Sequence, residues 1–278
     1  MQIFQDKQSL IQALKEIKAA GKSIGFVPTM GALHDGHISL VRSALKVTDQ
    51  VVVSIFVNPT QFNTASDLDK YPSTLQADIA LLQKEGDIFV FAPAVSEIYP
   101  EDDFFGPFDL EGIDLVMEGK FRPGHFQGVV HVVRNLFQIV QPQKAFFGLK
   151  DFQQVAVIRL MTKKLALPIE IVACAIERST NGLALSSRNL RLSETQKEDA
   201  LILFQTLALL KKLKKEFSPA VSREKAMEFF KKGKLELEYL ELVSSETLEA
   251  LDQTWSESST CCIAAFCGEV RLIDTAQL

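Results

Sequence analysis

The chain lacks the features that mark membrane and secreted proteins. No apolar run in the sequence reaches the ~18 residues that a membrane-spanning helix needs. The first residues, Met1 to Lys7, have neither the basic segment nor the apolar segment of a secretory signal peptide. We therefore expect a cytoplasmic protein that does not bind membranes.

Cysteine is scarce and is not arranged for metal binding. The four cysteines, Cys174, Cys261, Cys262 and Cys267, form neither two spaced Cys-x-x-Cys pairs nor a Cys/His ligand pattern. Three of them fall in one apolar run near the end of the chain. We expect buried free thiols in a reducing compartment.

An excess of positive charge is also absent. The 30 Lys and Arg residues are outnumbered by 35 Asp and Glu residues, which gives a net charge of −5. A protein that binds nucleic acid by neutralising its phosphates is usually basic. We therefore expect small-molecule partners and no nucleic acid.

Up to about residue 175, short β-branched runs alternate with longer segments of helical period. Strands are predicted at residues 23–27, 50–57, 87–92, 145–148 and 169–176. Helices are predicted at residues 9–20, 36–47, 73–84, 126–140 and 151–165. This alternation is typical of an α/β fold in which helices cover both faces of a Rossmann-like parallel sheet. In such a sheet, ligands bind outside the carboxyl ends of the strands.

The pattern changes after residue 176. Helices are predicted at residues 193–217 and 222–232, and strands at residues 235–243, 261–266 and 270–273. Ser193 suits the start of the first helix, and the lysines near its end favour the helix dipole. We therefore predict a Rossmann-like domain over residues 1–176 and a smaller α+β domain with a short antiparallel sheet over residues 177–278.

Histidine is rare, yet two of the four histidines stand in one motif, His34-Asp35-Gly36-His37. The motif opens a predicted helix, where free N–H groups favour an anion. The two imidazoles would face the same way and donate hydrogen bonds to phosphate oxygens. A glycine between them leaves room for a sugar or a base. Two ordinary surface histidines are the alternative, but their clustering favours a site for nucleotide phosphates.

Other charged groups follow later strands. Lys150 can place an ammonium near a phosphate, although a surface lysine beside Asp151 is the alternative. Ser186, Ser187 and Arg188 suit a pyrophosphate leaving group, although a polar linker would also contain serine.

Three neutral amides, Asn58, Gln61 and Gln154, suit the hydroxyl groups of a small substrate. Arg122 could contact a phosphate or a carboxylate. Asp78 could bind a divalent cation, and an exposed helical aspartate is the alternative. The chain offers no evident nucleophile paired with a base.

Five segments in order resemble the pantoate-β-alanine ligases, also called pantothenate synthetases. They are residues 28–37 (PTMGALHDGH), 56–62 (FVNPTQF), 122–126 (RPGHF), 148–154 (GLKDFQQ) and 186–189 (SSRN), and the resemblance continues to residues 270–274. An HxGH motif alone also occurs in other nucleotidylyl transferases and in class I aminoacyl-tRNA synthetases. Five motifs in family order are far more specific.

The resemblance implies the ATP-dependent ligation of (R)-pantoate and β-alanine to pantothenate, with pantoyl adenylate as the intermediate and AMP and pyrophosphate as products. It implies that the first domain binds ATP and pantoate, that the second domain is a lid, and that the protein is a homodimer. It also places Mg²⁺ near Asp78.

The resemblance also assigns roles to individual residues. The residues expected to bind ATP are Met30, Gly31, Ala32, Leu33, His34, Asp35, Gly36, His37, Gly148, Leu149, Lys150, Asp151, Glu177, Leu185, Ser186, Ser187 and Arg188. The catalytic residues among them are His34, His37, Lys150, Ser186, Ser187 and Arg188. The residues expected to bind the other substrates are Asn58, Gln61, Arg122 and Gln154. The family pattern makes His37 a proton donor, and we interpret it as a hydrogen-bond donor because pyrophosphate is already a good leaving group.

Three other classes share parts of this pattern. A transferase that adenylylates a phosphate ester would need more basic residues, and a tRNA synthetase would need an anticodon-binding region that a short acidic chain leaves little room for. A silent nucleotide-binding protein has no need of so complete a set of phosphate-binding groups. Where the family usually has Pro-Thr-Val-Arg-Glu, residues 175–179 differ, which leaves the adenine pocket around Glu177 open.

Overall fold

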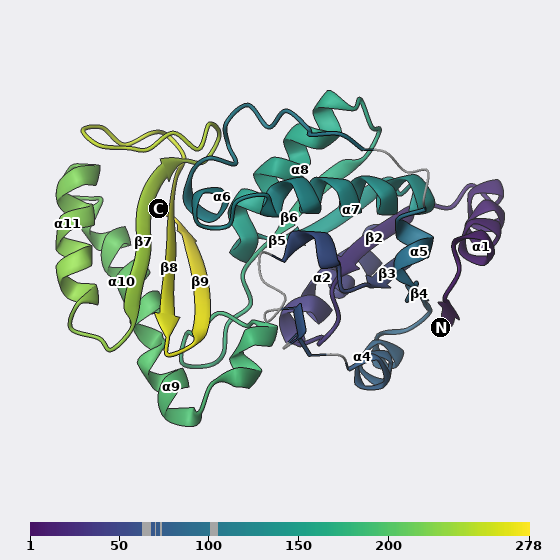
Figure 1. Ribbon diagram of the computed structural model, residues 1–278, viewed down its shortest axis with the longest axis horizontal. Coiled ribbons are helices and arrows are strands. Elements are labelled where there is room, and N and C mark those ends of the chain that lie inside the picture. The colour runs from purple at the N-terminus through teal and green to yellow at the C-terminus, as the bar shows by residue number, and fades with distance from the viewer. Residues whose placement is uncertain (63–67, 70, 73, 101–104) are drawn as a thin grey trace. The chain divides into compact units, whose positions relative to one another are not determined.

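The computed structural model describes residues 1–62, 68–69, 71–72, 74–100 and 105–278 (Figure 1). The chain packs as two units. The first contains Met1–Gly148 and Gln154–Cys174, and the second contains Leu149–Gln153 and Ala175–Leu278. A five-residue segment that the sequence analysis assigned to the first domain therefore packs with the second unit.

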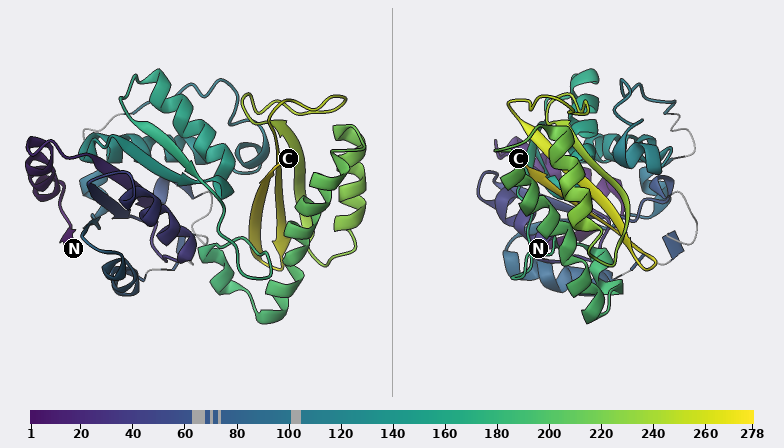
Figure 2. Two further views of the ribbon diagram at one scale, coloured as in Figure 1. Left: turned by 180° about the vertical axis from the view of Figure 1, so that it is seen from behind. Right: turned by 90° about the vertical axis from the view of Figure 1, so that its left-hand side faces the viewer.

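The first unit is built on a six-stranded parallel sheet in the order β1-β4-β3-β2-β5-β6. The strands are β1 (Gln2–Phe4), β2 (Ile24–Thr29), β3 (Gln50–Ile55), β4 (Ile88–Phe91), β5 (Lys144–Gly148) and β6 (Glu170–Cys174). This confirms the predicted Rossmann-like sheet, whose strands Figure 2 shows from two further sides. The sequence analysis missed β1, because a three-residue strand at the edge of a sheet has too few residues for a pattern.

Helices cover both faces of this sheet. They are α1 (Lys7–Ala19), α2 (Asp35–Leu45), α4 (Leu75–Leu82), α5 (Val95–Ile98), α6 (Met117–Phe121), α7 (His125–Val140) and α8 (Phe152–Lys164). Phe26 and Phe147 pack in one core with α1, α7 and α8, whereas their neighbours Val27 and Phe146 pack in another core with α2 and α4. Successive residues of a strand point to opposite faces, so both must be apolar here. The predicted start of α4, at Ser73, lies outside the described residues.

The strand order reverses beside β2. From β2 the chain continues to β3 and β4 on one side, while β5 and β6 lie on the other side. A parallel α/β sheet binds ligands at such a reversal, outside the carboxyl ends of its strands. The segment that follows Thr29 at the end of β2 is therefore placed for ligand binding.

The second unit contains a three-stranded antiparallel sheet, β7-β8-β9. Its strands are β7 (Glu236–Ser244), β8 (Ser259–Cys267) and β9 (Val270–Gln277), and its helices are α9 (Glu194–Asp199), α10 (Leu201–Leu213) and α11 (Pro219–Phe230). Leu207 and Phe230 join Ile263 in one apolar core, so α10 and α11 pack on the sheet. The predicted α+β class is confirmed, and β9 runs four residues further than predicted.

The prediction of one continuous helix over residues 193–217 is wrong. The chain forms α9 and α10, which are separated at Ala200, and α10 ends at Leu213. The Leu203 N–H bonds to the Ala200 oxygen, an i to i−3 bond that tightens the chain there. Ser193 does cap α9, in a reciprocal capping box with Gln196. The break falls where a polar segment gives way to a buried one.

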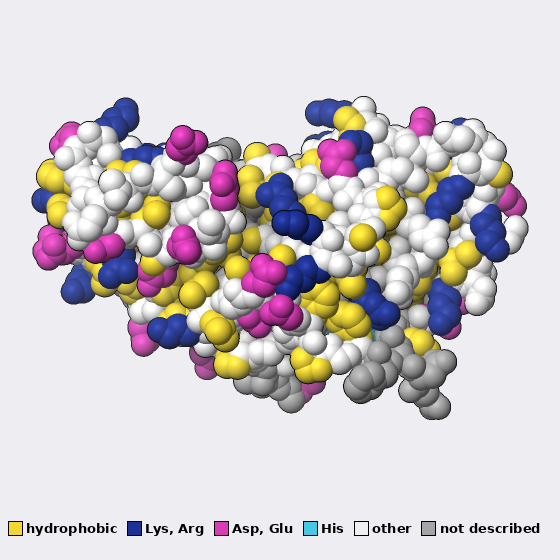
Figure 3. Space-filling view, turned by 90° about the horizontal axis from the view of Figure 1, so that it is seen from above, with side chains coloured by type: hydrophobic (Ala, Val, Ile, Leu, Met, Phe, Trp, Pro, Cys, Tyr) yellow, Lys and Arg dark blue, Asp and Glu magenta, His cyan; other side chains and the backbone are white. Residues whose placement is uncertain are grey.

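Within the described residues, no helix is both long enough and apolar enough to cross a bilayer. The four cysteines are free, and the three near the end of the chain are buried. On the face drawn in Figure 3, basic and acidic side chains are interspersed with apolar and uncharged ones. Charged side chains of both signs are therefore present on this face.

Candidate active site

The segment after β2 turns sharply before α2 begins. Gly31 and Ala32 both have left-handed backbones, with φ of 81° and 50°. Glycine accepts this conformation freely, whereas alanine adopts it only at a cost of ~1 kcal/mol. The turn is fixed from within the unit, because the Thr29 hydroxyl donates to the Ser54 oxygen at 2.7 Å and accepts from the Gly31 N–H.

The two histidines of the motif cap α2. His34 is the N-cap residue, and its Nδ1 accepts the Gly36 N–H at 3.1 Å. The Nδ1 of His37 accepts the His34 N–H at 3.3 Å, and the two ring centroids lie 4.1 Å apart. A neutral imidazole whose Nδ1 accepts carries its proton on Nε2. Each ring is therefore an Nε2–H donor beside a helix N-terminus, which suits an anionic oxygen.

Asp78 lies beneath this turn. Its side chain is only 1% exposed, so the alternative of an exposed helical aspartate is wrong. Its Oδ2 accepts the Ala32 N–H at 3.0 Å, and its Oδ1 accepts the Leu33 N–H at 2.8 Å. The Thr74 hydroxyl donates to the same Oδ1 at 3.2 Å. Both carboxylate oxygens are thus hydrogen bonded to the protein.

The amides of Asn58 and Gln61 are joined by the 3₁₀ helix η1 (Pro59–Gln61), which follows β3. The Asn58 Nδ2 donates to Gln61 Oε1 at 3.0 Å and to the Gly128 oxygen at 3.2 Å. The Asn58 Oδ1 accepts the Tyr99 hydroxyl at 2.7 Å and the Thr60 N–H. The Asn58 amide is therefore used within the protein, where it orients Gln61.

Gln61 connects this region to the turn after β2, because its Nε2 lies 2.9 Å from the Sδ of Met30. The Gln61 side chain is largely buried. An amide held by its neighbours in this way can select the hydroxyl or carboxylate groups of a small ligand. The two predicted binding segments, residues 30–37 and 58–61, are thus brought together within one unit.

Arg122 and His125 both contact the backbone of the same 3₁₀ helix, η1. The His125 Nδ1–H donates to the Gln61 backbone oxygen at 2.9 Å, and Arg122 lies 3.1 Å from His125 Nε2. Arg122 also pairs with Glu118 at 3.6 Å. His125 is 6% exposed, so it acts on the backbone that carries Gln61. The sequence suggested that the basic residues of this loop, Arg122 and His125, could contact a phosphate or a carboxylate, but not that His125 would hold the Gln61 backbone.

Helix α7 approaches η1 closely at Gly128. A Cβ at this position would lie 2.5 Å from the Thr60 oxygen and 2.9 Å from the Gln61 Cα. Only glycine permits this approach, because backbone atoms cannot yield as a flexible side chain can. Sequence periodicity gives no signal for such a contact.

Lys150 belongs to a one-turn helix, η3 (Leu149–Asp151), in the second unit. Its Nζ lies 3.4 Å from the Asp151 carboxylate. The turn is held by the last strand of the chain, because the Thr275 hydroxyl of β9 donates to the Leu149 oxygen at 2.8 Å. Lys150 is partly buried and its backbone is anchored, unlike that of an ordinary surface lysine.

A buried ion pair lies beside this anchor. Both Asp274 oxygens accept from the Arg178 guanidinium, at 2.6 and 2.8 Å, and Asp274 is 1% exposed. Burial raises the pKa of Asp274, while Arg178 and the nearby Lys150 act to lower it. The Asp274 oxygen also accepts the Thr275 N–H, which joins the ion pair to the strand that holds Leu149.

Ser186, Ser187 and Arg188 also lie in the second unit. Ser186 caps the 3₁₀ helix η4 (Ser187–Arg191), because its Oγ accepts the Arg188 N–H at 3.3 Å. The Leu185 N–H bonds to the Glu177 oxygen at 3.0 Å, so these two predicted nucleotide-binding residues are neighbours. The segment is folded back on itself by hydrogen bonds and is not an open linker.

The remaining predicted residues are placed as follows. Gly148 ends β5 at the carboxyl edge of the sheet, and Gln154 is partly exposed on α8. Asp35 is the exposed first residue of α2. The roles predicted for Gly148, Gln154 and Asp35 therefore stay predictions.

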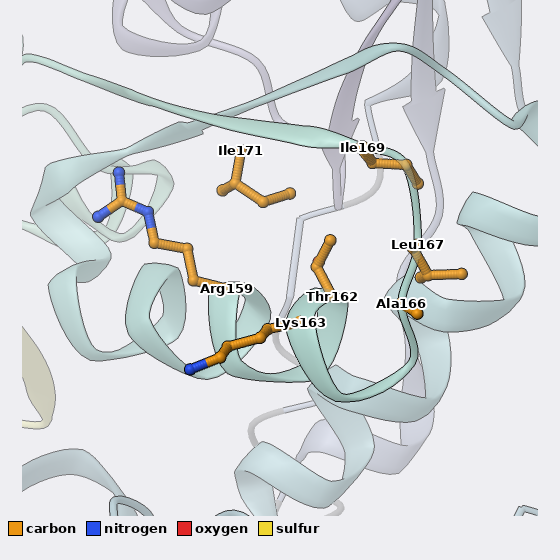
Figure 4. Close-up of a pocket in the computed structure, with 7 residues that line it drawn as sticks. All are labelled: Arg159, Thr162, Lys163, Ala166, Leu167, Ile169 and Ile171. Atoms are coloured by element: carbon orange, nitrogen blue, oxygen red, sulfur yellow. The ribbon is translucent and has the colours of Figure 1, made fainter.

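An open cavity of about 460 Å³ lies beside α8 and β6 in the first unit (Figure 4). It is lined by Arg159, Thr162, Lys163, Ala166, Leu167, Ile169 and Ile171. Ile169 and Ile171 stand at the amino end of β6, whereas ligands of parallel sheets bind at the carboxyl ends. We assign this cavity no part in the site.

Three features of the first unit therefore act together: a parallel sheet with a strand-order reversal, an HxGH turn at that reversal, and a buried amide beside it. Together they define an enzyme of the nucleotide-binding HxGH type. Over residues 2–277 the sequence matches the family of pantoate-β-alanine ligases. The chain belongs to that family and is a ligase.

Curated relatives and solved structures agree. The chain is 49% identical to a pantothenate synthetase of Christiangramia forsetii, over 100% of this chain and 99% of the relative, and 50% identical to one of Phocaeicola vulgatus, over 99% and 98%. A pantothenate synthetase structure from Thermus thermophilus covers 99% of both chains with a TM-score of 0.93 at 39% identity. A pantoate-β-alanine ligase of Francisella tularensis, solved with Beta-gamma ATP and β-alanine, covers 99% of this chain and 97% of its own with a TM-score of 0.83 at 35% identity.

Proposed function

We propose that this ligase joins (R)-pantoate to β-alanine through a pantoyl adenylate. First, a carboxylate oxygen of pantoate attacks the α-phosphorus of ATP, the bond from that phosphorus to the bridging oxygen breaks, and pyrophosphate leaves. Then the amine of β-alanine attacks the acyl carbon, AMP leaves, and the nitrogen loses a proton. The products are pantothenate, AMP and pyrophosphate. No covalent bond to the protein is needed, so catalysis rests on positioning and on charge stabilisation.

The observation that carries the proposal is the pair of Nε2–H donors of His34 and His37 at the start of α2, in one unit with the anchored Gln61 amide. The imidazoles would donate to phosphate oxygens, and Gln61 would hold pantoate and border the β-alanine site. We propose Gln154 as a second contact to pantoate. Asn58 and Arg122 would act on the substrate through Gln61, in keeping with their bonds to it.

The residues proposed for ATP fall in both units. In the first unit, residues 30–37 and Gly148 would approach the nucleotide. In the second, Lys150, Ser186, Ser187 and Arg188 would stabilise charge on the phosphates, and Leu149, Asp151, Glu177 and Leu185 are proposed as further contacts to ATP. A lysine ammonium suits a phosphate whose geometry changes during reaction, because it is a point charge on a flexible stem.

We propose that Mg²⁺ arrives with ATP and is held by its phosphates. The described residues contain no cluster of three or more His, Cys, Asp or Glu side chains that could hold a metal ion. We also propose a homodimer, which the family resemblance alone implies, and a cytoplasmic location, in keeping with four free thiols.

The experiment that tests this function is pantoate-dependent exchange of labelled pyrophosphate into ATP without β-alanine. Exchange should require pantoate, and adding β-alanine should then release AMP and pantothenate in equal amounts. The proposal is wrong if ATP is consumed equally well without pantoate. It is also wrong if a phosphate ester such as phosphopantetheine is the preferred acceptor.

A further inference from the structure

Asp78 is a buried acidic residue, only 1% exposed, that the proposed reaction does not use. It stands in the first turn of α4, and each of its oxygens accepts a backbone N–H from the segment directly before the HxGH motif. The N–H groups of Ala32 and Leu33 converge on the two oxygens of one carboxylate. Successive backbone N–H groups in a turn can form a concave anion site. Here the anion is a side chain of the protein itself.

This arrangement does not fit a magnesium ligand. Mg²⁺ binds to lone pairs of carboxylate oxygens and demands near-octahedral geometry. Each Asp78 oxygen instead accepts a backbone N–H, from Ala32 or from Leu33. The partial positive charge of these hydrogens opposes a cation at the same place. The Thr74 hydroxyl takes a further lone pair of Oδ1.

We infer that Asp78 is a positioning residue that holds the turn from Gly31 to Leu33 and, through it, the imidazole of His34. The physical reason is the unfavourable left-handed backbone of Ala32, which two charge-assisted hydrogen bonds offset. Leu33 directly precedes the N-cap residue, so a displaced turn would move the Nε2–H donors. Met30 lies on the other side of the turn and contacts Gln61, so the same carboxylate supports both parts of the site.

The substitution Asp78→Asn tests this inference. Asparagine has the same shape but presents an NH₂ group to one of the two backbone N–H groups, so one bond is lost and a repulsive contact is gained. In the ligand-free, magnesium-free protein, hydrogen exchange of the Ala32 and Leu33 amides should accelerate at least tenfold, since a hydrogen bond to a charged group contributes this much. Exchange in α1 should stay unchanged. Gln76→Ala, at an exposed position of α4, is the control and should change neither.

A second arm rests on the proposed function and uses pyrophosphate exchange. In Asp78→Asn the rate should fall at least tenfold, and the Mg²⁺ concentration for half-maximal rate should stay within twofold of the unmodified enzyme. The inference would be overturned if high Mg²⁺ restored the rate of pyrophosphate exchange in Asp78→Asn while hydrogen exchange of the Ala32 and Leu33 amides stayed unchanged. If Asp78→Asn does not fold, Thr74→Val removes one hydrogen bond to the same carboxylate and should show the same pattern at smaller size. The hydrogen-exchange measurement needs no substrate. Failure of the proposed function would therefore not be mistaken for failure of the inference.

Discussion

Replacing Gly128 with alanine tests how closely α7 must approach the loop that carries Gln61. The added Cβ would lie 2.5 Å from the Thr60 oxygen, whereas ordinary contacts begin at 3.4 Å. The shortfall is about 0.9 Å, and the contacted atoms are backbone, so the helix and the loop must separate by roughly that distance. The same loop is tied to Gly128 through the Asn58 amide.

A shift of about 1 Å in a group that orients a substrate costs on the order of 10²-fold in rate. We therefore expect kcat/KM for pantoate to fall about 10²-fold in Gly128→Ala, while the KM for ATP changes little. Helix propensity alone predicts the opposite direction, because alanine in a helix interior is otherwise more stabilising than glycine by ~0.5–1 kcal/mol.

The assay is steady-state pantothenate formation with pantoate varied at saturating ATP and β-alanine, together with a thermal melt. Gln138→Ala, at an exposed position of the same helix, is the control and should keep full activity. A Gly128→Ala enzyme within threefold of the original kcat/KM would refute the reasoning. So would an equal loss for ATP and pantoate with a lowered Tm, because that result indicates unfolding.

Three further outcomes are expected. Lys150→Ala should lower turnover by on the order of 10²-fold, as loss of one preorganised charge does, and a change below about threefold would show that Lys150 does not stabilise charge on the phosphates. Gln61→Ala should weaken pantoate binding with ATP affinity largely kept, as titration calorimetry can measure, whereas equal loss of both would indicate a folding defect. Hydrogen bonds from the side chain and backbone of Ser23 lower the pKa of Asp49 below 3.8. This stabilisation is present above the unfolded-state pKa and is lost as the pH falls through the lower folded-state pKa. Between about pH 5 and pH 2, the free energy of unfolding of Asp49→Asn should therefore fall less than that of the original protein. Urea denaturation at each pH measures this difference.

Sequence periodicity was sufficient for β2 to β6, because strands buried on both faces are continuous apolar runs and the helices between them keep a clear period. It could not place Asp78, because a helical aspartate has the same pattern whether it faces water or a loop more than 40 positions away in the chain. The clustering of His34 and His37 directed the prediction of a site to the turn after β2. The tautomers of these histidines depend on local backbone bonds that only coordinates reveal.

The break at Ala200 was missed for a related reason. An amphipathic pattern continues across it, and that pattern carries no signal for the i to i−3 bond from Leu203 to Ala200. The assignment of Lys150 to the first domain followed from its neighbours in the chain. Its anchor lies in β9, 126 positions away, which no local pattern can report.

The bond from Thr275 to Leu149 sets a condition on how the enzyme matures. Thr275 is synthesised 126 positions after Leu149, so the turn that carries Lys150 leaves the ribosome well before its partner strand. A nascent chain can complete its parallel sheet and its HxGH turn while this lysine is still unanchored. On the role proposed for Lys150, a nascent chain interrupted before Thr275 would therefore bind nucleotide better than it turns it over.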